Sequence, residues 1–589
     1  MVSSEFRSQN SEVRIQSRYQ VRRTDLEYWF ENIPCQAACP VGTKAGEYVS
    51  AIARGDYDDA ARIAVSPNPL AMICGLVCAH PCEKLCRRAS IDEPVAIRAL
   101  KRTALEQGQL KSLSSPSSKN GKRVAVIGAG PAGLAAAGEL AMMGHQPVIF
   151  EATDRLGGMT SFGIPRYRLP LSVIEENGRF ILDNSNIELR TNVVVGRDVL
   201  VADLLHSGGF SAVIAAVGAH LPRKMPLEGR DLKGVFEGVD FLREVACEKP
   251  TNHGKRVAVI GGGNVAMDAA RTSLRLGANH VLLVYRRGLA EMPASAEEIH
   301  HAREEGIEFK LLTDPIKIIG DKTGWVKEIE CLKMELSEAD ESGRRQPIPI
   351  KDSEFRIEVS TVIMAIGQLP DNGWAKGLDG LAVTRLGTPV IDKDTLSTKV
   401  DGLFAAGDLA TGPGIAISAV ESGIRAARQV DAYLNKQKVC LKKHLKQEVV
   451  TYATDPEIDC IRRQDPPALS ADSRKTGFQQ VEIAFDRQTA QEQARRCLNC
   501  FNNTVFNQEE CLLCGGCVDV CPNYCLRLIS PQEAGIDVEQ DSLSQGKTLL
   551  IKDEERCIRC GLCVRHCPAG AINMVHFEFE KEWVYEQRN

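Results

Sequence analysis

The stretch RVAVIGAGPAGLAAA, residues 123–137, decides the fold of this chain. An apolar strand at residues 124–127 leads into a glycine-rich turn and then into an alanine-rich helix. In such a turn Gly128 allows the tight bend, Gly130 lets a pyrophosphate approach the backbone, and Gly133 permits close packing of helix on strand. The helix N-terminus then faces the phosphate charge. The stretch therefore predicts an α/β domain that binds a dinucleotide.

A second apolar strand, residues 147–150, ends at Glu151, where a carboxylate can accept hydrogen bonds from ribose hydroxyls. The turn, the start of the helix and the acid together form the first predicted site. Its candidate residues are Gly128, Gly130, Pro131, Ala132, Gly133, Glu151 and Ala152.

The same pattern returns as RVAVIGGGNVAMDAA, residues 256–270, with Ala266 at the third glycine position, which the motif allows. The next strand, residues 281–285, ends in Arg286 and Arg287, where the first site ends in a carboxylate. Guanidinium groups pair with a 2′-phosphate that a carboxylate would repel, so the pattern favours NADP over NAD. The alternative is that these arginines are surface residues of an NAD site. The turn itself comprises Gly261, Gly262, Gly263, Asn264, Val265 and Ala266.

Sixteen of the 21 cysteines fall into spacings suited to iron–sulfur clusters. Two C-x2-C-x2-C-x3-C-P runs near the C-terminus form the signature of a protein with two [4Fe–4S] clusters, in which the fourth cysteine ligates the other cluster. The predicted ligand sets are Cys511, Cys514, Cys517 and Cys567 for one cluster, and Cys557, Cys560, Cys563 and Cys521 for the other. Zinc is the alternative, because paired C-x2-C motifs also bind Zn²⁺.

A further cysteine group lies near the N-terminus. Cys74, Cys78, Cys82 and Cys86 are four residues apart, so a continuous helix would place them on one drifting face. Upstream lie Cys35 and Cys39, which gives six cysteines where two cubic clusters need eight. The missing pair is predicted to be Cys497 and Cys500 in ARRCLNC, residues 494–500.

Composition limits the class of protein. The chain has 589 residues, 43% hydrophobic and 25% charged residues and a net charge of −5, which argues against a general nucleic-acid binder. No apolar run is long enough to span a bilayer, and the first twenty residues lack the apolar region of a secretory signal. Many cysteines without such a signal indicate a reducing compartment. We expect a cytoplasmic protein that binds no nucleic acid and does not insert into a membrane.

Three further motifs resemble those of FAD-dependent oxidoreductases with two dinucleotide-binding folds. RLGGM at 155–159 is similar to the loop after the ribose-binding acid, and GLFAAGD at 402–408 to the second FAD motif, whose acid faces the ribityl-phosphate region. GPGIA at 412–416 opens a helix whose N-terminus would face the flavin pyrimidine ring. The resemblance implies that the first site holds FAD. It adds Leu156, Gly157, Gly158, Met159, Gly367, Gly407, Asp408, Ile415 and Ala416 to that site.

Residues 34–437 resemble the small (beta) subunit of NADPH-dependent glutamate synthase. They are also similar to two relatives, the N-terminal half of dihydropyrimidine dehydrogenase and the large subunit of NADH-dependent ferredoxin:NADP oxidoreductase. The motifs that carry this resemblance are CGLVCAHPCEKLCRR at 74–88, GGMTSFGIPRYRLP at 157–170 and VYRRGLAEMPA at 284–294.

The chain departs from this family in one place. Members usually carry C-x2-C-x4-C-x3-C near the N-terminus, whereas here its first half stands at 497–500 and its second half at 35–39. By analogy with the relatives, the resemblance implies one cluster on Cys35, Cys497, Cys500 and Cys86, and another on Cys39, Cys74, Cys78 and Cys82. The alternative is that the cysteines at 497 and 500 are bystanders or bind zinc.

These observations predict an α/β protein with two Rossmann-like domains, one for FAD and one for NAD(P)H. An N-terminal α-helical iron–sulfur domain and a C-terminal α+β bacterial-ferredoxin-like domain flank them. The predicted parts are an N-terminal arm at 1–33, a helical iron–sulfur domain at 34–115, an FAD domain at 120–250 and 366–437, an NAD(P)H domain at 251–365, a linker at 438–504 and a ferredoxin-like domain at 505–589. The serine-rich stretch 112–122 supports the first domain boundary.

The expected function is that of an FAD- and iron–sulfur-dependent NAD(P)H oxidoreductase or subunit. It would pass electrons between NAD(P)H and a ferredoxin or partner subunit through flavin and four [4Fe–4S] clusters. Hydride transfer needs no protein acid or base, so no catalytic residue is assigned. The alternatives are a glutamate-synthase-type small subunit feeding a glutamate-forming partner, and an electron-relay subunit without nicotinamide activity.

Five cysteines stand apart from these motifs in the sequence, at positions 247, 331, 440, 460 and 525. Free cysteines of this kind are most often small buried hydrophobic residues. A thioredoxin-reductase-type enzyme needs a C-x2-C beside its flavin, and residues 120–437 contain none. That absence argues against such an enzyme.

Overall fold

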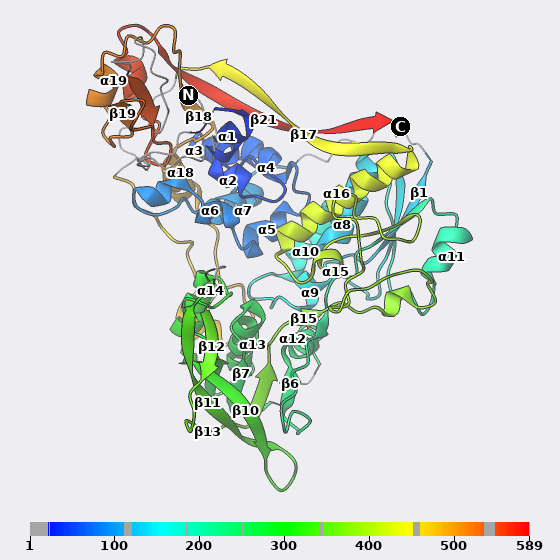
Figure 1. Ribbon diagram of the computed structural model, residues 1–589. Helices are drawn as coiled ribbons and strands as arrows, with labels where there is room; N and C mark the ends of the chain where they lie inside the picture. The colour runs from blue at the N-terminus through cyan, green and yellow to red at the C-terminus, as the bar shows by residue number, and fades with distance from the viewer. Residues whose placement is uncertain are drawn as a thin grey trace, which may run out of the picture.

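A computed structural model describes most of the chain, and Figure 1 shows its arrangement. The described residues are 22, 24–110, 121–183, 186–249, 253–340, 343, 345–451, 460–534 and 548–587. Most of the predicted arm at 1–33 and the serine-rich stretch at 112–120 lie outside them. Within the described residues, no helix is both long enough and apolar enough to cross a bilayer.

Short helices form the N-terminal region. They are α1 (Leu26–Glu31), α2 (Pro34–Ala37), α3 (Ala45–Ala53), α4 (Tyr57–Val65), α5 (Ala71–Val77), α6 (Pro81–Lys84), the 3-10 helix η1 (Arg87–Ser90) and α7 (Ile97–Gln107). Cys78 is extended, and His80 has left-handed backbone geometry (φ 37°) before Pro81. Because a proline disfavours helical geometry in the residue before it, the four cysteines at 74–86 do not share one continuous helix. They lie instead on two short helices and the turns that follow them.

The first parallel sheet contains the glycine-rich turn at 128–133. Its strands are β1 (Arg123–Ile127), β2 (Gln146–Phe150), β3 (Glu188–Arg190), β4 (Ala212–Ala215) and β16 (Leu403–Ala405), in the order β16-β4-β1-β2-β3. The main helices beside it are α8 (Pro131–Met142), α10 (Leu171–Leu182) and α16 (Ala416–Leu434). The shorter ones are α9 (Met159–Phe162), α11 (Val201–His206), η2 (Gly373–Ala375) and α15 (Asp408–Thr411). The sheet is completed by β16, which follows an excursion of the chain through the second sheet.

The second parallel sheet lies in the lower part of Figure 1. Its strands are β6 (Val235–Glu237), β14 (Thr361–Met364), β7 (Arg256–Ile260), β8 (His280–Tyr285) and β9 (Glu308–Leu311), paired in that order. Its helices are α12 (Gly238–Ala246), α13 (Asn264–Arg275) and α14 (Ala296–Glu304). An antiparallel sheet adjoins it, made of β10 (Thr313–Gly320), β11 (Val326–Ala339), β12 (Arg345–Pro349) and β13 (Phe355–Glu358). Two short strands between the sheets, β5 (Leu221–Pro222) and β15 (Gln368–Leu369), pair with each other.

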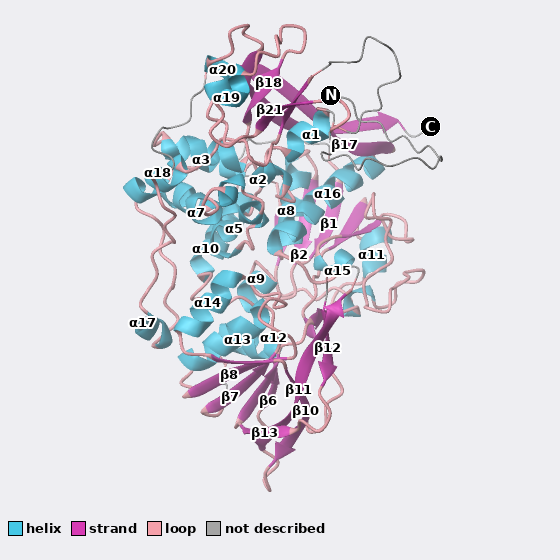
Figure 2. Ribbon diagram, turned by 60° about the vertical axis from the view of Figure 1, so that its left-hand side comes forward, coloured by secondary structure: helices cyan, strands magenta, loops and turns pink. Residues whose placement is uncertain are grey.

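The C-terminal region is tied to the rest by a long antiparallel ribbon, visible at the top of Figures 1 and 2. All 13 residues of β17 (Gln437–Val449) pair with β21 (Ile572–Gln587). The other elements are α17 (Ala471–Lys475), α18 (Arg487–Arg495), β18 (Asn502–Phe506), α19 (Gly516–Asp519), β19 (Leu526–Ile529), β20 (Leu549–Lys552) and α20 (Leu562–Arg565).

The segment 438–504, predicted to be a linker, contains most of β17, the helices α17 and α18, and the start of β18. Most side chains of β17 are exposed, so the strand lacks the apolar alternation by which a buried strand is recognised. The predicted α/β architecture with two dinucleotide-type sheets is confirmed, and this segment is the main difference.

Candidate functional site

The turn of the first site adopts the geometry that its glycines predict. Gly128 has a φ of +102°, and its N–H donates to the carbonyl of Phe150 (2.8 Å). A Cβ on Gly133 would collide with the Gly128 carbonyl, so helix and strand approach each other closely here. Gly130 caps α8 without a side-chain hydrogen bond. The first N–H groups of α8 therefore have no side-chain acceptor from the cap and can bind an anion.

Glu151 is buried at the end of β2, and both of its carboxylate oxygens already accept hydrogen bonds. Oε2 accepts from the N–H of Ala129 (2.8 Å), and Oε1 accepts from the N–H and the hydroxyl of Thr153 (2.9 and 2.7 Å). A carboxylate has further lone pairs, so these bonds fix its orientation and leave capacity for a ribose hydroxyl. Ala152, the next residue, is exposed.

Two loops distant in sequence meet the start of α8. The N–H of Gly157 donates to the carbonyl of Ala129 (2.8 Å), and a Cβ on Gly158 would lie 3.1 Å from the Cα of Gly130. A Cβ on Gly407 would lie 2.7 Å from the Cβ of Ala132. The structure thus brings together the three segments that the sequence assigns to FAD.

The side chains of this site differ in what they contact. Leu156 packs on Gly178 in the core of the domain, and Ile415 caps the start of α16. Asp408 Oδ1 accepts from the N–H of Gly414 (3.1 Å), and burial raises the pKa of Asp408 to about 6. Met159 begins α9, and Ala416 begins α16.

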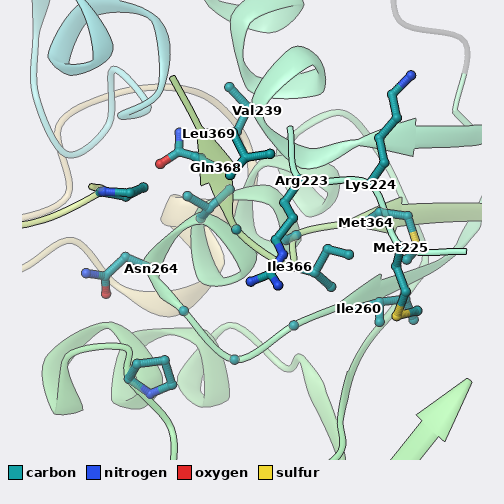
Figure 3. Close-up of a pocket in the computed structure, with 18 of the residues that line it drawn as sticks. Arg223, Lys224, Met225, Val239, Ile260, Asn264, Met364, Ile366, Gln368 and Leu369 are labelled. Carbon is teal, nitrogen blue, oxygen red and sulfur yellow. The ribbon is translucent and has the colours of Figure 1, made fainter. Parts of the chain in front are cut away.

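One cavity of about 750 Å³ contains the second dinucleotide turn (Figure 3). Its walls include the turn at 261–265, the residues at 284–287 and the segment 364–370. Gly412 and Pro413, from the loop after Asp408, line the same cavity. A nucleotide bound on the second turn would therefore extend toward the first site.

The charge of this cavity comes from both predicted and unpredicted residues. Arg286 and Arg287 line it, and the Arg287 Nη2 donates to Gln346 Oε1 (3.3 Å). Arg223 and Lys224 also line it, and sequence analysis missed them because a basic pair after a two-residue strand resembles any exposed pair. Figure 3 shows the Lys224 amine pointing away from the other labelled side chains.

The second turn has a close contact of its own. A Cβ on Gly262 would lie 2.6 Å from the ring of Tyr285, whose hydroxyl donates to the carbonyl of Glu291 (2.8 Å). Asn264 Oδ1 accepts from the N–H of Ser295 (3.0 Å), which orients the amide. The turn is therefore held between the end of β8 and the start of α14.

The cysteines of the divided motif meet in space. Cys35, Cys86, Cys497 and Cys500 line one small cavity of about 30 Å³. Burial raises the pKa of the Cys497 thiol to about 12. Four thiols around one cavity match the number of ligands that one [4Fe–4S] cluster needs.

Arg496 holds this segment against the N-terminal helices. It is fully buried, and its guanidinium donates to Asp92 Oδ1 (2.9 Å), the carbonyl of Glu93 (2.7 Å) and the carbonyl of Ile461 (3.2 Å). Arg496 therefore anchors Cys497 and Cys500, which follow it in the chain.

The remaining N-terminal cysteines form a second group. Burial raises the pKa of Cys74 to about 12, with further contributions from Cys78 and Cys39. Burial likewise raises the pKa of Cys82, with Cys78 and Cys39 again contributing. Lys101, itself buried, acts in the opposite direction on these thiols. The four cysteines are thus near neighbours.

The C-terminal cysteines group as the two runs predict. Burial raises the pKa of Cys517, and Cys511, Cys514 and Cys567 add to the shift. The other group, Cys521, Cys557, Cys560 and Cys563, lines one cavity of about 20 Å³. In both groups one cysteine comes from the opposite run.

Cys525 stands apart from the cysteine motifs in the sequence, but the fold brings it to one of them. It is buried and lines the same cavity, and its Sγ lies 3.3 Å from the Sγ of Cys521. The fold brings it there because β19 begins directly after it. Among the other four, Cys331 is buried, Cys440 and Cys460 are exposed, and Cys247 is half-buried.

Among the described residues, no three His, Cys, Asp or Glu side chains converge as one metal ion requires.

Three regions of the chain match models of known protein families. Residues 122–423 match the model of pyridine nucleotide-disulphide oxidoreductases. Residues 29–112 match the dihydropyrimidine dehydrogenase domain II with a 4Fe–4S cluster, and residues 510–571 match the 4Fe–4S dicluster domain.

Curated relatives are similar over most of the chain. The NADP(+)-dependent formate dehydrogenase subunit beta of Moorella thermoacetica is 38% identical over 510 residues, which cover 80% of this chain and 71% of that one. The NADPH-Fe(3+) oxidoreductase subunit beta of Geobacter sulfurreducens is 36% identical over 506 residues, with coverages of 80% and 75%. The glutamate synthase [NADPH] small chain of Azospirillum brasilense is 34% identical over 422 residues, with coverages of 68% and 86%.

Proposed function

Since the chain belongs to the pyridine nucleotide-disulphide oxidoreductase family and carries 4Fe–4S domains at both ends, we propose that it is the NADPH-reactive subunit of an electron-transfer complex. The observation that carries the proposal is the single cavity shared by the second dinucleotide turn and the loop after Asp408. The similar chains named above are themselves described as subunits or as a small chain, which supports a partner for this one.

FAD belongs in the first site in this proposal. The uncapped start of α8 would bind its pyrophosphate, and the fixed carboxylate of Glu151 would accept from its ribose. The loops at 157–158 and 407–408 close over the same helix start. These residues position the cofactor, and no acid or base is assigned among them.

NADP belongs in the second site. The turn at 261–266 would face the pyrophosphate, and the guanidinium groups of Arg286 and Arg287 would pair with the 2′-phosphate. When bound, FAD takes an electron pair from NADPH and iron–sulfur clusters carry single electrons. The apolar side chains of Val239, Met364 and Ile366 line the cavity and would exclude water.

Four [4Fe–4S] clusters fit the four groups of cysteines, with the ligand sets that the sequence suggests. All 21 cysteines are free thiols, as a reducing compartment such as the cytoplasm would keep them. We also keep the domain boundaries drawn from the sequence as a proposal, with the segment 438–504 as a structured connection. The physiological acceptor or donor would be a ferredoxin or a partner subunit that docks near the C-terminal clusters.

A glutamate-forming partner is less well supported. The glutamate synthase small chain covers 68% of this chain, whereas the formate dehydrogenase and Fe(3+) oxidoreductase subunits cover 80%. The additional C-terminal domain instead favours a partner that exchanges single electrons.

The test is to mix the purified protein anaerobically with NADPH or with NADH and follow flavin absorbance. Rapid bleaching with NADPH and slower bleaching with NADH is the expected result. Bleaching with NADH alone would overturn the choice of NADP. No bleaching with either nucleotide would overturn the enzymatic function and favour a relay subunit. Affinity capture from cells of the source organism would then identify the partner.

A further inference from the structure

A buried ion network lies between the two ends of the chain at Glu554. Its carboxylate contacts Lys552 Nζ (2.6 Å), Arg559 Nη2 (2.8 Å) and Arg87 Nη1 (3.3 Å). The hydroxyl of Tyr28 also donates to it (3.2 Å). Two of these partners, Arg87 and Tyr28, belong to the N-terminal region, so the network joins regions more than 460 residues apart in sequence.

The network is shielded from water. The side chains of Glu554, Arg87 and Lys552 are 10%, 11% and 6% exposed. A charge in such surroundings acts more strongly on its neighbours than one in solvent, because the effective dielectric constant is lower. Removing one of these charges is therefore felt at nearby groups.

The network borders one cysteine group at each end of the chain. Arg87 directly follows Cys86 and lines the cavity of Cys35, Cys497 and Cys500. Lys552 lines the cavity of the group that contains Cys557, and Glu554 precedes Cys557 by three residues. The Arg87–Glu554 contact thus spans from one group to the other.

We propose that Glu554, through its contacts with Arg87 and Lys552, tunes the potentials of the two clusters beside it, one in the N-terminal and one in the C-terminal region. The proposal rests on the proposed function, because it requires clusters on both cysteine groups. A carboxylate disfavours the added negative charge of a reduced cluster, whereas the ammonium group of Lys552 favours it. The two residues are thus positioning residues with opposite effects on potential.

The experiment is an anaerobic redox titration of the purified full chain, followed by electron paramagnetic resonance. Glu554→Gln is expected to raise the reduction potential of each of the two clusters by about 59 mV. This corresponds to about a tenfold change in a one-electron reduction equilibrium. Lys552→Gln is expected to lower the same two potentials. Glu554→Asp keeps the charge and should restore values close to those of the unchanged protein.

The matched control is Glu555→Gln, an equal loss of charge at the exposed neighbouring position. Equal potentials in Glu554→Gln and Glu555→Gln would overturn the proposal, as would an equal shift of every cluster. Iron content is measured for each variant. If Glu554→Gln loses iron, Lys552→Gln decides: lowered potentials of the two clusters support the proposal, and raised or unchanged potentials contradict it. A complete lack of iron in the unchanged protein would instead refute the proposed function.

Discussion

At the scale of single residues, the two glycine-rich turns differ in the charge that lies beside them. The equivalent strands β2 and β8 are followed by side chains of opposite sign, Glu151 and the pair Arg286 and Arg287. Glu151 is fixed by hydrogen bonds to Ala129 and Thr153, whereas the arginines line the cavity. The same backbone motif therefore presents an acceptor in one domain and cationic donors in the other.

The first prediction concerns nucleotide preference. The double change of Arg286 and Arg287 to Gln is expected to lower kcat/KM for NADPH about 10–100-fold, because charge-assisted hydrogen bonds contribute about 1.5–3 kcal/mol. The value for NADH should stay within about twofold of the unchanged protein. Steady-state dye reduction measures both. Arg197→Gln, at a position 70% exposed, is the control, and an equal fall with both nucleotides would contradict the assignment.

The second prediction concerns pH. Burial would raise the pKa of Asp92, but hydrogen bonds from Arg88 and Arg496 hold it well below its usual range. A lowered folded pKa stabilises the fold fully above the unfolded value of about 3.9 and loses that effect as the pH falls below it. Asp92→Asn should therefore lower the urea midpoint of unfolding by a constant amount at pH 6–8, and by less below about pH 4.

Circular dichroism follows this unfolding. Asp465→Asn, at a side chain 85% exposed, is the control and should change the midpoint little at any pH. A difference between Asp92→Asn and the unchanged protein that stays the same down to pH 3 would show that Asp92 does not act through its charge.

At the scale of elements, short helices and one long ribbon position the cysteines. The helices α5 and α6 are separated by a break at residues 78–80, where the chain turns. Cys74 and Cys86 therefore lie in different N-terminal cysteine groups. The β17–β21 ribbon lies beside α1, where the rings of Trp29 and Phe577 stack with centroids 4.3 Å apart. The ribbon therefore attaches the C-terminal region to the N-terminal helices.

The third prediction tests this attachment. Phe577 is 2% exposed, so Phe577→Ala is expected to cost about 3–5 kcal/mol of local stability. Amide hydrogen exchange in β18 and β21 should then accelerate at least about 100-fold, since 1.4 kcal/mol is about a factor of ten. Val449→Ala, at a position 67% exposed in the same ribbon, should change exchange within about twofold. Equal rates in both variants would place the attachment elsewhere.

At the scale of the whole molecule, the order of sites in space differs from their order in sequence. Cys497 and Cys500 return to Cys35 and Cys86 across more than 400 residues, and the network at Glu554 joins that group to the C-terminal one. The cavity that contains the second dinucleotide turn also reaches Gly412 and Pro413, next to the first site.

The fourth prediction follows from that layout. Changing Cys497 and Cys500 to Ala is expected to reduce iron from about sixteen to about twelve atoms per chain, because one [4Fe–4S] cluster loses two ligands. Colorimetric iron analysis of anaerobically purified protein measures this. Cys440→Ala, at an exposed cysteine, should leave the iron content unchanged. Full iron content in the double variant would show that these two cysteines are not cluster ligands.

The sequence by itself determined the features that depend only on residues close together in the chain. The two turns at 128–133 and 261–266, the charges after β2 and β8, and the two ferredoxin-type cysteine runs follow from backbone geometry and spacing within about thirty residues. Tertiary structure alone decided that Gly412 and Pro413 line the cavity of the second turn, that Cys525 lies beside Cys521, and that Arg87 meets Glu554. These contacts join segments through packing and buried charge, and such pairing leaves no periodic trace in either segment alone.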